Sequence, residues 1–69
     1  MTDAELCARY CINPGELWLL RRYREAADGA ETAAEANGLM RLACARIDWE
    51  RDRGWGEFRR LWLDIVGLT

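Results

Sequence analysis

The side chains able to do chemistry in this 69-residue chain are three cysteines (Cys7, Cys11 and Cys44) and twelve acidic residues. Histidine, serine, lysine and glutamine do not occur in it. A nucleophilic thiol or hydroxyl needs a neighbouring base, and no imidazole is present to act as one. Acid–base chemistry by two carboxylates stays open, but such a site needs a cleft, which short helical chains seldom form. The composition therefore predicts a protein that is not an enzyme and uses no cofactor.

The cysteines allow a metal or redox site but do not favour one. Cys7 and Cys11 are one helical turn apart and could share a face. Free cysteine is more often a buried core residue, and a disulfide between neighbours on one helix would distort its geometry. Zinc needs four ligands, and three cysteines with a carboxylate at unmatched spacing make a poor site. We therefore expect no metal site, no disulfide scaffold and, without a signal-peptide pattern, a reducing cytoplasmic location.

Length and charge narrow the class of protein further. A chain of 69 residues predicts one domain, residues 1–69, whose core is only marginally sufficient, so self-association would add useful buried area. No apolar run approaches the ~18 residues of a membrane span. All ten cations are arginine and the net charge is −2, which argues against a strong non-specific hold on nucleic acid. Arginine instead suits bidentate pairing and stacking at interfaces.

Two capping signals define the elements of the N-terminal half. Thr2 followed by Glu5 forms a capping box, which predicts a short helix from residue 3 to about residue 11. Asn13 can cap a second helix, with proline at its first position and Glu16 completing another capping box. This helix should end at residues 28–29, where glycine follows aspartate. Its buried stripe is predicted to be Leu17, Leu20, Tyr23 and Ala27.

The C-terminal half predicts two more helices. Residues 31 to about 53 indicate the longest helix, with the charged residues 46–53 as its solvated end, although a break at Asn37-Gly38 is an alternative. A last helix, residues 57–66, should bury Phe58, Leu61, Trp62 and Ile65 and turn Arg59 and Arg60 outward, after a turn around Trp55. The fold class is therefore all-α, a small bundle of three to four helices. A heptad-like seam in the long helix predicts a homodimer interface formed by Ala33, Ala36, Met40, Ala43 and Ile47.

Residues 3–24 resemble the helix-turn-helix of insertion-sequence transposases and related homeodomain-like regulators. The matching pieces are Glu5-Leu6-Cys7, Arg9-Tyr10, Ile12 and Arg21-Arg22-Tyr23-Arg24. The resemblance implies a helix-turn-helix-like N-terminal part and places Cys11 where the family has a turn glycine, so Cys11 should adopt an unfavourable backbone angle. The positions that would read bases are Asn13, Gly15, Glu16, Trp18, Leu19 and Arg22. Tryptophan and leucine are poorly suited to that task.

These observations favour a small binding protein that acts stoichiometrically on a protein partner, as an inhibitor or adaptor of the kind that phages and mobile elements encode. The alternatives are a helix-turn-helix DNA-binding transcriptional regulator and a structural subunit of a larger assembly. Exposed tryptophan and arginine are enriched where protein interfaces are strongest. The predicted partner-binding residues are Trp18, Leu19, Arg21, Arg22, Trp55 and Arg59.

Overall fold

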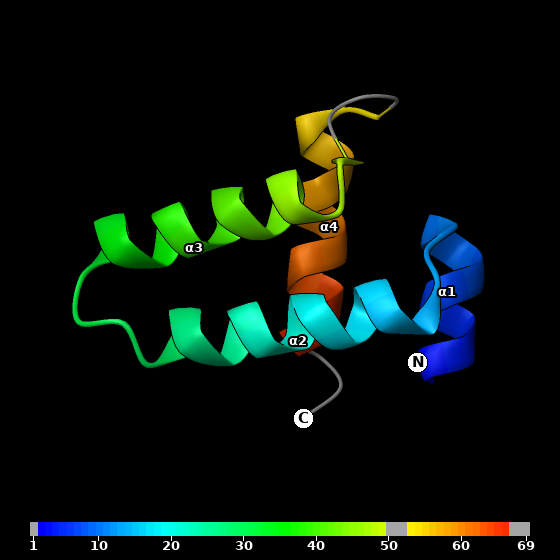
Figure 1. Ribbon diagram of the computed structural model, residues 1–69, viewed down its shortest axis with the longest axis horizontal. Helices are drawn as coiled ribbons and strands as arrows, with labels where there is room; N and C mark the ends of the chain where they lie inside the picture. The colour runs from blue at the N-terminus through cyan, green and yellow to red at the C-terminus, as the bar shows by residue number, and fades with distance from the viewer. Residues whose placement is uncertain (1, 50–52, 67–69) are drawn as a thin grey trace.

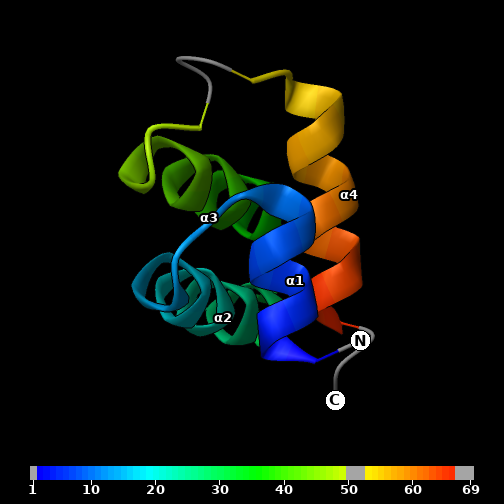
Figure 2. The ribbon, with the colours of Figure 1, turned by 90° about the vertical axis from the view of Figure 1, so that its right-hand side faces the viewer.

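A computed structural model describes residues 2–49 and 53–66, and these residues form four helices and no strand. The helices are α1 (Asp3–Tyr10), α2 (Pro14–Asp28), α3 (Ala33–Arg46) and α4 (Trp55–Val66). Helices α2 and α3 lie antiparallel, and α4 crosses behind both (Figure 1). Helix α1 stands beside the N-terminal end of α2 and runs alongside α4 (Figure 2). The all-α prediction is confirmed.

The first two helices begin where the capping residues predict. The Thr2 hydroxyl accepts a hydrogen bond from the backbone N–H of Glu5, and the Glu5 carboxylate accepts one from the backbone N–H of Thr2. Asn13 and Glu16 make the same reciprocal pair at the start of α2. Each box satisfies backbone donors that the first turn of a helix otherwise leaves free. Local sequence alone therefore determines both starts.

One hydrophobic cluster joins all four helices. Leu6, Leu20, Phe58 and Leu61 are fully buried, and the α4 face predicted from the sequence, which also includes Trp62 and Ile65, is buried throughout. The α2 stripe is buried at Leu17, Leu20 and Ala27 and half-buried at Tyr23. Helix α2 packs against each of the other three helices and is the centre of the bundle.

The predicted long helix is wrong at both ends. It begins at Ala33, because Thr32 caps it by accepting a hydrogen bond from the backbone N–H of Glu35. It ends at Arg46 rather than near residue 53, so α2, with 15 residues, is longer. Asp48 takes a left-handed backbone with φ 55°, which turns the chain and buries Trp49. Contrary to the prediction, residues 47–49 and 53 thus do not belong to α3, and residues 50–52 of the predicted charged helix end lie outside the described residues.

Helix α3 runs unbroken through Asn37-Gly38, so the predicted alternative of a break there is wrong. Most residues of the predicted dimer seam pack against the core of their own chain. Ala43 is fully buried, and Ala36, Met40 and Ile47 pack half-buried against the core. The fifth seam residue, Ala33, is exposed.

The last helix begins two residues earlier than predicted. Trp55 is its first residue and lies on the core, stacked on Phe58 with ring centroids 5.7 Å apart. The predicted turn around Trp55 is therefore wrong, because Gly56 is already helical. Arg59 and Arg60 are exposed, as predicted.

Candidate functional site

The exposed side of α2 carries the strongest candidate for an interaction site. Trp18 is 61% exposed, which is unusual for so large an apolar side chain. The exposed Arg22, one turn further on, holds its guanidinium carbon 5.3 Å from the centre of the Trp18 ring. Leu19 beside them is half-buried. We call Trp18, Leu19, Arg21 and Arg22 the α2 face.

A shallow hollow of about 360 Å³ lies between α1 and α2 at the edge of this face. Trp18 and Leu17 from α2 and Ala4 and the half-buried Cys7 from α1 line it. Its surface is mostly apolar, so a partner's side chain would leave water on entering it. The exposed Trp18 ring thus borders an apolar hollow.

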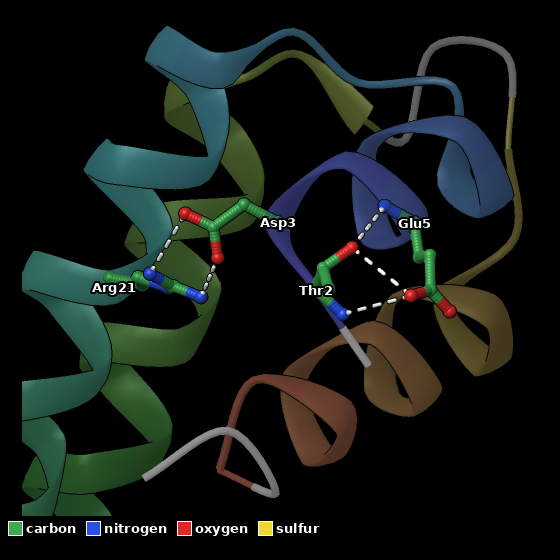
Figure 3. A network of polar contacts seen from close by, with 4 residues as sticks. All are labelled: Thr2, Asp3, Glu5 and Arg21. Atoms are coloured by element: carbon green, nitrogen blue, oxygen red, sulfur yellow. Dashed lines mark hydrogen bonds and ion pairs between the residues drawn. The ribbon is translucent and has the colours of Figure 1, made fainter.

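An ion pair between Asp3 and Arg21, both of which line the hollow, links α1 to α2. The guanidinium of Arg21 donates two hydrogen bonds to the carboxylate of Asp3, one from each terminal nitrogen, with Nη1 3.2 Å from Oδ2 (Figure 3). Such a two-pronged pair restricts the orientation of both groups. Arg21 is thus occupied by a partner inside the chain, whereas Arg22 has no anionic partner among the described residues.

The residues that cap α2 already use side-chain oxygens within the chain. The side chains of Asn13 and Glu16 are each bonded to the other's backbone N–H, at 2.8 and 3.0 Å. These are two of the six positions that would read bases under the helix-turn-helix resemblance. Gly15, a third such position, has no side chain that could contact a base. Trp18, Leu19 and Arg22 are the three of these positions whose side chains no cap engages.

The turn between α1 and α2 spans Cys11 to Asn13 and is held by Arg53, which lies between α3 and α4 in the sequence. Cys11 has a left-handed backbone, φ 53° and ψ 50°, as the resemblance led us to expect. The guanidinium of Arg53 donates to the backbone carbonyl oxygens of Tyr10 and Cys11, the latter at 2.9 Å. Its carbon lies 4.2 Å from the centre of the Trp49 ring. Arg53 thus ties the segment after α3 to this turn.

Tyr10 links α1 to α4 through its hydroxyl, which donates a hydrogen bond to the carboxylate of Asp64. Burial of the ring, together with this bond and the negative charge of Asp64, raises the pKa of Tyr10 above its usual 10.0. The pair lies between α1 and α4 and does not line the hollow beside Trp18. We assign it a structural role.

The predicted site residues do not form one surface. Trp55 and Arg59 line a different hollow, together with Asn37, Met40 and Arg41, and none of these residues borders the hollow beside Trp18. Trp55 is also half-buried against the core. The predicted site therefore combines residues of two separate surfaces.

The three cysteines lie in different surroundings: Cys44 is buried, Cys7 half-buried and Cys11 exposed. Within the part of the chain that the structure describes, no cluster of three or more cysteine, aspartate or glutamate side chains is arranged to hold a metal ion. In that same part, every helix is too short or too polar to cross a membrane.

Comparison with known proteins adds no relative to this picture. No family model, no curated protein and no solved structure matches the chain. Over the described residues, the fold and the site geometry show a small all-α bundle of four helices with an exposed tryptophan–arginine surface.

The predicted site residues do not include two arginines that the fold places over tryptophan rings of another helix. The guanidinium carbon of Arg24 lies 5.3 Å from the centre of the Trp62 ring, and that of Arg41 lies 5.4 Å from the centre of the Trp55 ring. Each pair joins two different helices. No local spacing signals such pairs, so only the tertiary structure reveals them.

Proposed function

We propose that this protein is a non-enzymatic binding protein that acts stoichiometrically on a protein partner, as an inhibitor or adaptor, through the α2 face. The observation that carries the proposal is the exposure of Trp18 beside the apolar hollow between α1 and α2. Tryptophan and arginine are the residues most enriched where protein interfaces derive their affinity. The absence of histidine and serine from the chain supports a role without catalysis.

The geometry suits a partner that encloses the Trp18 ring. Arg22 lies over that ring, so the two side chains present one flat apolar and cationic surface. Helices α1 and α2 pack through the buried Leu6, Leu17 and Leu20, so the hollow between them exists before the partner arrives. A site formed in advance loses less conformational entropy on binding.

The experiment compares two matched double variants in a pulldown from lysate of the source cells, followed by native mass spectrometry. Trp18→Ala/Arg22→Ala removes the proposed contact. Leu42→Ala/Arg46→Ala is the control, because these residues have the same spacing on α3 and Leu42 is 54% exposed. We expect an equimolar complex with the wild type and the control, and at least about a ten-fold loss with the first variant. Equal capture by both variants would refute the α2 face.

A second candidate is DNA binding through a helix-turn-helix. The observation that favours it is the left-handed Cys11 in a three-residue turn between two capped helices. Against it, the caps engage Asn13 and Glu16, and Arg21 is paired with Asp3. It predicts retention of sequences from a random duplex pool with a steep dependence on salt. Failure to retain any duplex at low salt would eliminate it.

Homodimer formation through the α3 seam is a separate proposal. It would require a second copy to contact residues that already pack half-buried against their own core. Light scattering over a range of concentrations tests it, and a strict monomer at high concentration would reject the seam.

A further inference from the structure

A second surface, formed by α3 and α4 with the end of α2, gathers arginines over an aromatic floor. Two hollows of about 260 and 220 Å³ share Asn37, Met40 and Arg59 as lining residues, so they adjoin. Arg24 and Trp62 also line the first, and Arg41 and Trp55 also line the second. We call the combined depression the arginine groove. It is separate from the α2 face, because none of its lining residues belongs to that face.

The aromatic floor fixes two of the guanidinium groups. Arg24 lies over Trp62 and Arg41 over Trp55, with distances of 5.3 and 5.4 Å to the ring centres. A guanidinium that lies over an indole loses rotational freedom while its in-plane N–H groups stay available. Such a group can bind a carboxylate through two parallel hydrogen bonds with little further loss of freedom.

The groove has more positive charge than its own acids neutralise. Arg41 and Arg59 form no ion pair with any acid in residues 2–49 or 53–66. Asp28 lies 3.2 Å from Nε of Arg24, yet this buried nitrogen makes no hydrogen bond, so that pair is geometrically incomplete. The groove is therefore lined by three arginines and one aspartate, in a chain whose net charge is −2. The excess is local and not a property of the whole protein.

We propose that the arginine groove binds an acidic peptide segment of a partner protein, in which carboxylates flank an apolar side chain. The carboxylates would pair with Arg41 and Arg59, and the apolar side chain would contact Met40 and the tryptophan rings. Charge complementarity and the mixed polar and apolar lining carry this inference. A nucleic-acid backbone fits less well, because affinity for it comes from many cations and this groove also holds Asp28.

The probe is a fluorescein-labelled peptide of alternating glutamate and leucine, compared with the same peptide carrying glutamine for glutamate. Binding is followed by fluorescence anisotropy and located by the indole N–H signals in NMR spectra of the wild type. Arg41→Gln/Arg59→Gln removes the two unpaired charges. Arg46→Gln/Arg60→Gln is the control, because it also removes one exposed arginine from α3 and one from the exposed side of α4.

We expect the glutamate peptide to bind at least ten-fold more tightly than the glutamine peptide, and to shift the indole signals of Trp55 and Trp62 but not that of Trp18. We expect about a ten-fold loss of affinity with Arg41→Gln/Arg59→Gln and little change with the control. If the first variant fails to fold, the wild-type indole shifts decide the question.

Four results would overturn the proposal. The first is no preference for glutamate over glutamine, and the second is equal weakening by the two double variants. The third is retention of a duplex oligonucleotide that depends on Arg41 and Arg59, which would assign the groove to phosphates. The fourth is a wild-type dimer that Arg41→Gln/Arg59→Gln converts to a monomer, which would assign the groove to a second copy of the chain.

Discussion

Replacing Arg53 by methionine tests how the turn between α1 and α2 is held. Its guanidinium donates one hydrogen bond to each of two backbone carbonyls and lies over the Trp49 ring. A hydrogen bond from a charged donor contributes about 1.5–3 kcal/mol, and a cation over an aromatic ring about 0.5–1 kcal/mol when exposed. The lower values for two such bonds and one ring contact come to about 3.5 kcal/mol. Because Arg53 is half-exposed and water competes for these contacts, we expect a smaller loss, about 2–3 kcal/mol in the free energy of unfolding.

For a domain of this size such a loss lowers Tm by about 10–20 °C. Arg53→Lys should lose about half as much free energy, because it keeps the charge but cannot span two carbonyls. Urea unfolding followed by circular dichroism measures both. The control is Arg46→Met, an exposed arginine for which we expect a change within about 0.5 kcal/mol. If Arg53→Met and Arg46→Met destabilise the protein equally, the contact with the turn contributes nothing and the reasoning is refuted.

Two further predictions concern the stability of the bundle. Gly38→Ala should stabilise the protein by about 0.5–1 kcal/mol in urea unfolding, because the site is inside α3 and an added Cβ meets open space; a destabilised variant would mean that α3 does not run through this glycine. The raised pKa of Tyr10 means that the folded state holds the phenol proton more tightly than the unfolded state. This stability is complete below pH 10.0 and lost as the pH rises through the folded pKa, so the wild type should lose more stability than Tyr10→Phe between pH values below and above 10.0; parallel losses would contradict this.

The helix starts could be predicted because their causes are local. The capping pairs Thr2–Glu5 and Asn13–Glu16 each lie within four residues, and the apolar spacing of α4 follows from its own helical period. The end of α3 could not be predicted in this way. Its charged continuation is compatible with a helix, but Trp49 contacts Phe58, and burying that ring requires the chain to turn at Asp48.

The two candidate sites differ in the same way, because one depends on local sequence and the other on tertiary packing. Exposure of Trp18 could be predicted, because it lies outside the apolar stripe of its own helix. The arginine groove could not, since Arg24 and Arg41 meet their tryptophans only after three helices have packed. The prediction that Trp55 binds a partner rests on its place outside any apolar stripe and on the arginines near it in the sequence. Neither signal shows that Trp55 begins α4 and stacks on Phe58.

The distribution of the four tryptophans gives the protein its own optical reporters. Trp49 and Trp62 are buried and Trp55 is half-buried, whereas Trp18 lies mostly in water. Long-wavelength emission and acrylamide quenching should therefore come mainly from Trp18, and short-wavelength emission from the three rings beside Phe58. Occupation of the α2 face and loss of the fold should thus change different parts of one fluorescence spectrum, without any attached dye.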